Sequence, residues 1–325
     1  MESLRIAREI EERKAKESAA RKRKLYTVLA KVETSLEKYK AFEYFGDIQN
    51  LYDSLLAGYK SAKNAIDAND FDTAVEMAEG LLVPQEKIDA LLPVVKKYYS
   101  IRDFVDEARK GAMSAEASRY AKESFDKAEQ RYKNVKSFAE KKDFVSALRG
   151  IEGLADLYKA AKNEAETNPE AIYQKGLVAR QAGKQSEAFS CFTQAAEKRH
   201  PAALANLGLC YLKGQGANKD EARAFNCFQD ASKLNYAQAQ YFLAGCYAKA
   251  IGVKYEKESA RVWMAIARAN GNKAAGDFLA KAGWVVLEDE VRAINEMLNE
   301  GKTSVEISTV MKSALQHIVD CKGGE

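Results

Sequence analysis

The residues of this chain that could carry out catalysis are few, beginning with its two histidines. A Ser/His/Asp or Cys/His arrangement would have to use His200 or His317, and neither lies in a recognisable catalytic motif. His200 stands at a junction between repeating segments, where the equivalent residues are Tyr236 and Asn272. A polar loop residue is therefore the simpler interpretation of His200. The sequence predicts a protein that is not an enzyme and has no catalytic residues.

The cysteines follow the same repetition and leave two interpretations open. Cys191 and Cys227 are thirty-six residues apart, as are Cys210 and Cys246, while Cys321 stands alone. None has the C-x-x-C spacing of a zinc site. The cysteines could be small buried hydrophobes on equivalent helices. Alternatively, Cys191 could pair with Cys210 and Cys227 with Cys246 in an oxidising compartment.

Glycine and charge patterns give no sign of a cofactor or a metal. Gly214-x-Gly216 precedes no phosphate-binding pattern, and the chain has neither a Walker loop nor a dinucleotide fingerprint. Glu9, Glu11 and Glu12 form a charge run without metal-ligand spacing. We therefore expect no cofactor and no metal site.

The charge balance does not favour nucleic acid as a partner. The chain has 51 basic and 47 acidic residues, a net charge of +4, whereas nucleic-acid binding is marked by a clustered basic surface. A basic run at 21–24 could contact an acidic surface, but the same polar segment holds five acids, which favours a solvated helix face. Nucleic-acid binding through this run remains a third possibility, and it would depend strongly on salt.

The sequence gives no sign of membrane insertion. No stretch approaches the roughly 18 apolar residues of a membrane span. Residues 1–5 lack the apolar region of a signal peptide, which predicts a cytoplasmic protein. A leader removed before residue 1 would leave the same sequence.

The chain matches itself at two offsets, and this repetition defines the elements that position these residues. Units that repeat at a fixed period bury their apolar faces by stacking on their neighbours. The thirty-six-residue offset aligns Leu207 with Leu243, Cys210 with Cys246, Tyr211 with Tyr247, Gly216 with Gly252, Ala224 with Ala260 and Ala231 with Ala267. The seventy-three-residue offset aligns Tyr59 with Tyr132, Asp70-Phe71 with Asp143-Phe144, and 79–81 with 152–154.

These offsets, with helical spacing of apolar residues throughout, predict an all-α protein in four parts. We expect a polar helical arm at 1–24, which could pair with a partner helix, and a duplicated helical domain at 25–167. Its copies, about 24–96 and 97–167, each have a long helix, a second helix, a tight turn and a third helix. The break at 167–169 separates this domain from repeats at 168–283, and capping helices follow at 284–325.

Local signals support the ends of these elements. Asp70 and Asp143 can cap the helices that follow the two tight turns. Tyr59 and Tyr132 each begin a Tyr-Lys-x-x-Lys motif, in which we expect packed rings and solvated lysines.

The tail carries its own helix signals. Gly301 should end the first tail helix, and Thr303 with Glu306 forms a capping box for the second. The predicted apolar side of the second tail helix consists of Val305, Val310, Leu315 and Ile318.

The segment 203–231 carries a recognisable pattern. It reads Ala203-x3-Leu207-Gly208-x-x-Tyr211-x-x-Gly214-x-Gly216-x3-Asp220, followed by Ala224-x-x-Cys227-Phe228-x-x-Ala231. This pattern closely resembles the SEL-one-like repeat (SLR), a tetratricopeptide-related family of two-helix units. The resemblance covers about 169–283. The first unit lacks a four-residue expansion of its loop and looks like an ordinary tetratricopeptide repeat, and the third has Ala244 and Ala250 where the second has glycine.

The resemblance implies an α-solenoid that serves as a non-enzymatic scaffold or adaptor. Its partner would be a peptide or a protein bound in a concave groove lined by the first helix of each unit. Aromatic, amide and basic groups in this groove would suit an extended peptide or an acidic segment. Transferred by alignment, the groove residues are Tyr173, Leu177, Arg180, Gln181, Asn206, Leu209, Leu212, Lys213, Gln238, Tyr241 and Lys249.

The alternative function is an exported repeat protein that binds or hydrolyses cell-wall-type substrates. Some cysteine-rich relatives of these repeats have been linked to cell-wall fragments or β-lactams. Their cysteines sit eight apart within a unit, whereas the pairs in this chain are nineteen apart. The resemblance to that group is therefore weaker.

Overall fold

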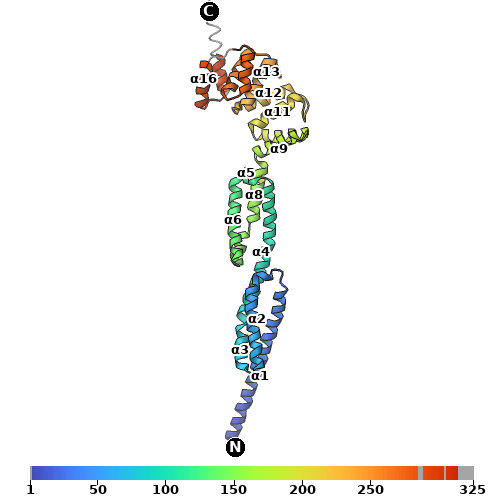
Figure 1. Ribbon diagram of the computed structural model, residues 1–325, viewed down its shortest axis with the longest axis vertical. Helices are drawn as coiled ribbons and strands as arrows, with labels where there is room; N and C mark the ends of the chain where they lie inside the picture. Colours follow the sequence, from blue (N-terminus) through green and yellow to red (C-terminus); the bar gives the residue numbers. More distant parts are fainter. Residues whose placement is uncertain (1, 285–287, 304, 314–325) are drawn as a thin grey trace, which may run out of the picture. The chain divides into compact units, whose positions relative to one another are not determined.

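The computed structural model describes residues 2–284, 288–303 and 305–313. The chain divides into two compact units, Met1–Lys162 and Asn163–Glu325. The described residues of both units form helices joined by short loops, without any strand (Figure 1). The prediction of an all-α protein is confirmed.

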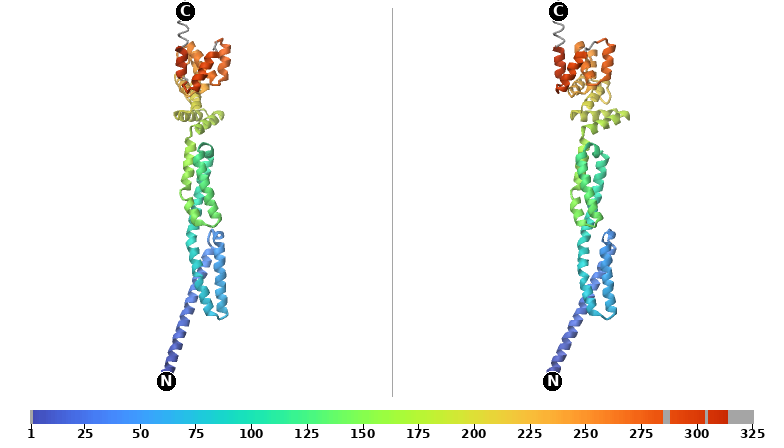
Figure 2. Two further views of the ribbon diagram at one scale, coloured as in Figure 1. Left: turned by 90° about the vertical axis from the view of Figure 1, so that its left-hand side faces the viewer. Right: turned by 60° about the vertical axis from the view of Figure 1, so that its left-hand side comes forward.

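The first unit contains two helical bundles that share one helix. In the first bundle, α1 (Glu2–Lys40), α2 (Phe45–Asp67) and α3 (Phe71–Gly80) pack with the first half of α4 (Leu82–Ser114). The second half of α4 packs with α5 (Ala117–Tyr120), α6 (Lys122–Glu140) and α7 (Phe144–Ile151), and α8 (Leu154–Thr167) follows (Figure 2). The expected border between the copies, 96/97, lies inside α4, so the two copies are joined by a continuous helix.

The tight turns between the second and third helices are built in the same way in both copies. The Asp70 carboxylate accepts a hydrogen bond from the Thr73 amide at 3.1 Å, and Asp143 accepts one from Ser146 at 3.1 Å. The residue before each aspartate has a positive φ, 58° at position 69 and 61° at position 142. The predicted capping by Asp70 and Asp143 is confirmed.

The basic run of α1 lies against α3. Lys24 Nζ is 2.7 Å from a Glu79 carboxylate oxygen, and an ion pair seventy-three residues later joins Lys97 to Glu152 at 2.9 Å. In the same run, the Lys22 ammonium lies 3.8 Å from the centre of the Phe71 ring. Contacts within the first bundle therefore account for much of this run without an external partner.

The repeated Tyr-Lys-x-x-Lys motifs behave as expected. Tyr59 is buried, and Tyr132 is half-buried and donates a hydrogen bond from its hydroxyl to Asp106 at 2.6 Å. The lysines of both motifs are exposed, at 60, 63, 133 and 136. The motifs thus contribute packing, and the interpretation of solvated lysines is confirmed.

A charged cluster stabilises the second bundle. Arg109 Nε and Nη2 donate to the two carboxylate oxygens of Glu129 at 2.6 and 3.0 Å, and the Tyr158 hydroxyl donates to the same carboxylate at 2.8 Å. The Glu129 side chain is 18% exposed. The hydrogen bonds from Arg109 hold the pKa of Glu129 below its usual value.

We expect this cluster to make the second bundle acid-sensitive. Because the pKa of Glu129 is lower in the folded protein, its contribution to stability is complete above the unfolded value of about 4.3. That contribution is lost as the pH falls through the folded pKa. At pH 7, Glu129→Gln should lower the free energy of unfolding by about 2 kcal/mol, since bonds to a charged group are lost. The variant should also show a shallower loss of stability in acid.

Hydrogen exchange of α4 and α6 peptides, measured from pH 7 down to pH 3, would test this expectation. Asp126→Asn is the matched control, because Asp126 is an exposed carboxylate on the same helix. Equal acid sensitivity of the wild type and Glu129→Gln would contradict the assignment.

The second unit is a row of helix pairs. α9 (Pro169–Gln181) packs with α10 (Gln185–Glu197), α11 (Pro201–Lys213) with α12 (Glu221–Lys233), and α13 (Ala237–Lys249) with α14 (Lys257–Ala269). Each pair contacts the next, and α15 (Lys273–Lys281) packs on α14. The loop between the helices of a pair covers 182–184 in the first pair and 214–220 in the second, which confirms the four-residue expansion.

Small residues let the helices of a pair approach closely. A Cβ added to Gly176 would lie 2.7 Å from the Phe192 ring, and one added to Gly208 would lie 2.7 Å from the Phe228 ring. The third pair has buried Ala244 at the equivalent position, and Met264 replaces the phenylalanine. Methionine is flexible enough to make room for an extra methyl group, so the departure from glycine is compensated.

The expanded loops need glycine for two different reasons. Gly214 ends α11 with a left-handed backbone, φ 67°, and Ala250 adopts the same conformation at φ 55°, so alanine does not change the loop of the third pair. At Gly216 and Gly252, φ is also positive, and an added Cβ would lie 2.4 and 2.1 Å from a carbonyl oxygen of the preceding pair. These two glycines therefore lie where consecutive pairs touch.

The tail continues the core of the last pair. α16 (Glu288–Asn299) packs against α14, and Arg261 donates to both carboxylate oxygens of Glu290 at 3.0 and 3.2 Å. Residues 305–313 form a further helix, and the chain has a positive φ of 79° at Gly301 before it.

The predicted capping box of this last helix is confirmed. The Thr303 amide donates to a Glu306 carboxylate oxygen at 2.7 Å, and the Glu306 amide donates to the Thr303 hydroxyl at 3.3 Å. The predicted apolar side is wrong in register. Val305 and Val310 are 39% and 49% exposed, whereas the buried residues are Ile307 and Met311, which join the core that contains α14. Leu315 and Ile318 lie outside the described residues.

Candidate partner-binding surface

His200 is a helix cap. Its Nδ1 atom accepts a hydrogen bond from the Ala203 amide at 3.1 Å, and Nε2 lies 2.7 Å from a Glu170 carboxylate oxygen. This arrangement assigns the ring proton to Nε2. Asn168 and Asn272 cap α9 and α15 at equivalent positions. His200 thus has a structural role, and His317 lies outside the described residues.

Four cysteines are free thiols in the structure: Cys191, Cys210, Cys227 and Cys246. Burial raises the pKa of Cys227 and of Cys246 to about 11. Both thiols are therefore protonated near neutral pH and are poor nucleophiles. Cys321 lies outside the described residues. In the part of the chain that the structure describes, no group of three or more His, Cys, Asp or Glu side chains is placed to hold a metal ion.

We define the first-helix face as the surface formed by α9, α11, α13 and α15. At its beginning the structure brings three predicted groove residues together. Arg180 Nη1 donates to Asn206 Oδ1, and Asn206 Nδ2 lies 3.4 Å from the Tyr173 hydroxyl. The Tyr173 ring stacks on His200 with 4.7 Å between ring centres. This part of the face is a connected polar surface.

The other predicted groove residues have varied surroundings. Gln238 accepts a hydrogen bond from Asn272 at 3.1 Å, so part of its amide is already engaged. Leu177 and Leu209 are half-buried and pack on the hydrophobic core. Gln181 and Lys213 are exposed at the ends of α9 and α11.

Three further predicted residues, Leu212, Tyr241 and Lys249, line one apolar pocket of about 240 Å³. The rest of its lining is Phe228, Phe242, Gly245, Cys246, Ile251, Met264 and Phe278. Among the lining residues that the structure describes, Lys249 is the one that carries a charge. The sequence analysis did not single out Gly245. A signal was present, since the first two pairs have Leu177 and Leu209 at the equivalent position.

The first-helix face has a distinct charge. The sequences of α9, α11, α13 and α15 hold six basic and two acidic residues, a net charge of +4. Their partner helices α10, α12 and α14 hold five basic and five acidic residues and are neutral. Among the helices of the repeats, the basic excess thus lies on the first helices.

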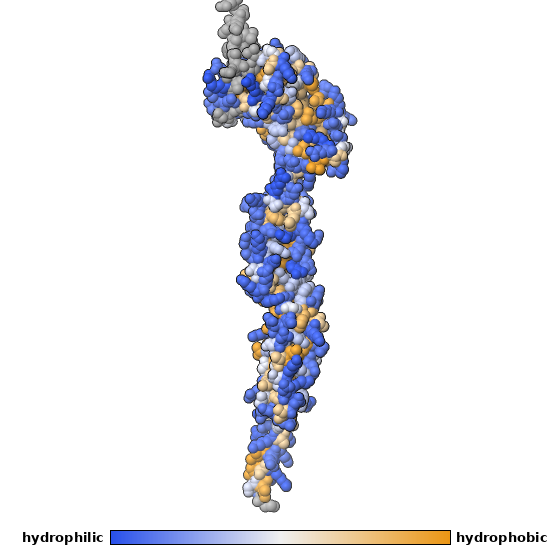
Figure 3. All heavy atoms as spheres, viewed as in Figure 1, coloured by the Kyte–Doolittle hydropathy of each residue, from blue (hydrophilic) through white to orange (hydrophobic). Residues whose placement is uncertain are grey.

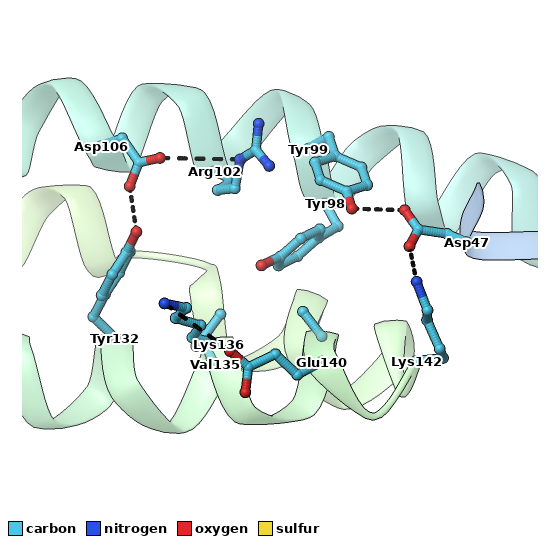
Figure 4. Close-up of a pocket in the computed structure, with 11 residues that line it drawn as sticks. Asp47, Tyr98, Tyr99, Arg102, Asp106, Tyr132, Val135, Lys136, Glu140 and Lys142 are labelled. Atoms are coloured by element: carbon cyan, nitrogen blue, oxygen red, sulfur yellow. Dashed lines mark hydrogen bonds and ion pairs between the residues drawn. The ribbon is translucent and has the colours of Figure 1, made fainter. Parts of the chain in front are cut away.

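The first unit contains a different, polar pocket of about 370 Å³ (Figure 4). Asp47 of α2 accepts a hydrogen bond from the Tyr99 hydroxyl at 2.6 Å and is ion-paired with Lys142, which joins the two copies. At the seventy-three-residue offset, the lining residues Tyr98, Arg102 and Ala139 correspond to Leu25, Leu29 and Ile66 of the first copy. The acids at 47 and 106 are already engaged by neighbouring side chains, so this pocket is a junction between the copies.

The surface of the second unit is mixed in character. Figure 3 shows apolar side chains in patches between polar and charged ones. Within the described ranges, no helix is both long enough and apolar enough to cross a membrane.

The chain is similar to solved structures of Sel1 repeat proteins. No protein-family model matches the chain, and no curated protein matches it. A Sel1 repeat protein from Oxalobacter formigenes is 31% identical, with a TM-score of 0.35, and the match covers 39% of this chain and 98% of that one. The protective antigen c5321 of uropathogenic Escherichia coli, described as displaying an SLR fold, is 18% identical, with a TM-score of 0.40. That match covers 73% of this chain and 51% of the antigen.

Both TM-scores are too low for the superpositions to support a conclusion. The assignment rests on sequence, through 31% identity over nearly the whole of the first protein and through the repeat pattern at 169–283. Helix pairs, expanded loops and close-packed small residues occur where that pattern requires them. The chain therefore belongs to the Sel1-like (SLR) repeat proteins.

Proposed function

We propose that the second unit binds an acidic segment of a partner protein along the first-helix face and so acts as an interaction scaffold. The observation that carries this proposal is the net charge of +4 on the first helices beside neutral partner helices. Complementary charge steers association and selects partners. The four free thiols give no support to the alternative of an exported protein with paired cysteines.

Two lysines are central to this charge. Lys213 and Lys249 are exposed, occupy equivalent positions and form no ion pair with a residue that the structure describes. A lysine in the last turn of a helix also interacts favourably with the helix dipole. Each of the four first helices has such a basic residue in its last turn. In the partner helices, acidic residues in the first turns offset the basic ones.

Reversing these charges tests the proposal. Recovery of the partner from native cells on immobilised Lys213→Glu/Lys249→Glu protein should fall about tenfold or more, because attraction becomes repulsion at two sites. The matched control is Lys198→Glu/Lys257→Glu, which reverses two exposed lysines beside or on the second helices. Equal recovery on both variants would rule out the first-helix face.

A further inference from the structure

We infer that the pocket at Gly245 receives one bulky apolar side chain from that acidic segment. This inference rests on the proposed function and specifies the partner. It predicts a segment in which a phenylalanine, leucine or methionine stands between aspartates or glutamates.

Gly245 has no structural reason to be glycine. Its backbone is helical, without a positive φ, and beyond its chain neighbours and its own helix backbone an added Cβ would meet no described atom within 4 Å. Gly176 and Gly208, by contrast, make room for phenylalanine rings. A glycine inside a helix destabilises it relative to alanine. What the glycine does provide is space, because Leu177 and Leu209 fill this position in the first two pairs.

The chemistry of the lining fits an apolar side chain. Aromatic rings come from Phe228, Tyr241, Phe242 and Phe278, and Met264 adds an adaptable thioether. An apolar cavity of about 150 Å³ can hold a benzene molecule. A pocket of about 240 Å³ therefore has room for one phenylalanine, leucine or methionine side chain.

Charges around the pocket specify what flanks that side chain. Lys249 is part of the lining, and Lys213 stands at the same position one pair earlier. Lys281 follows Phe278 by three residues, which places it on the same side of α15. The described residues of the lining include no acid. An apolar residue flanked by carboxylates complements this arrangement.

The test is selection from a library of twelve-residue peptides on the full chain. The central residue is varied among Phe, Leu, Met, Ala and Ser, and the flanks are drawn either from Asp, Glu, Ser and Gly or from Lys, Arg, Ser and Gly. We expect the wild type to select acidic flanks and to prefer a bulky apolar centre over alanine by about tenfold. Gly245→Leu introduces the residue found at this position in the first two pairs and fills the pocket. It should abolish the preference for a bulky apolar central residue and keep the preference for acidic flanks.

Gly245→Ala is the matched control, since a single methyl group leaves most of the pocket open and the preference intact. Thermal unfolding followed by tryptophan fluorescence shows that each variant is folded, because both tryptophans, Trp263 and Trp284, belong to the second unit.

The outcomes separate this inference from the proposed function. If Gly245→Leu keeps the preference for a bulky centre, the pocket inference is wrong and the charge-based proposal stands. If the wild type selects no acidic flanks, the proposed function fails as well. If the protein alone sediments as a dimer that Gly245→Leu dissociates, the pocket is occupied by a second copy of this chain, which also overturns the inference.

Discussion

Replacing Phe228 with alanine should lower the free energy of unfolding of the repeats by about 3–5 kcal/mol. The Phe228 side chain is 1% exposed and packs in the core that α12 shares with α13 and α14. Its ring also lies where a Cβ on Gly208 would be, so truncation leaves a void between two closely packed helices. Backbone packed this tightly cannot collapse fully into the void, and the cavity adds to the lost transfer free energy.

Urea unfolding followed by tryptophan fluorescence would measure this change in the second unit alone. The control is Val178→Ala on α9, because Val178 is 65% exposed and should contribute little. A loss below about 1 kcal/mol for Phe228→Ala would mean that the pairs repack around the cavity, contrary to the close approach described here.

Replacing Gly216 with alanine should lower the free energy of unfolding by about 3 kcal/mol. The left-handed backbone, φ 76°, accounts for roughly 1–2 kcal/mol. A further 1–3 kcal/mol is typical of overpacking, and the new Cβ would lie 2.4 Å from the Gln185 carbonyl oxygen. Since this carbonyl belongs to the preceding pair, the overlap would force consecutive pairs apart.

Gly214→Ala is the matched comparison. Its φ of 67° is also left-handed, but the nearest atom to an added Cβ is 3.5 Å away. It should therefore lose only the conformational part, roughly 1–2 kcal/mol, and Ala250 already occupies the equivalent position in the third pair. In the same urea titration, the difference between the losses in free energy of unfolding of Gly216→Ala and Gly214→Ala measures the cost of the overlap with the Gln185 carbonyl. Equal losses would show that contact between the pairs does not depend on Gly216.

Residues that recur were the ones whose roles could be predicted. Asp70 and Asp143 cap helices as expected, and the family pattern placed the helix pairs, because both depend on short-range geometry repeated in the sequence. The sequence predicts a polar loop residue at His200, but its position before Pro201 matches that of Asn168 before Pro169, and both residues cap helices.

Features that depend on a single distant partner could not be predicted in the same way. In the last described helix, either Val305 and Val310 or Ile307 and Met311 could form the buried side. Contact with the core around α14 buries Ile307 and Met311. The pocket at Gly245 arises where the third pair departs from the repeat, since Leu177 and Leu209 stand at the equivalent positions. A family pattern specifies the residues that recur, so it gives no sign of this pocket.

The continuous α4 sets an angle as well as a distance. An α-helix turns by about 100° per residue, so inserting one residue between the halves of α4 would rotate the second bundle by about 100° against the first. The ion pair from Asp47 to Lys142 could not form after such a rotation, and neither could the bond from Tyr99. The length of α4 therefore fixes the rotation of one bundle relative to the other. Insertions or deletions in α4 would keep this orientation only if they add or remove close to a whole number of helical turns.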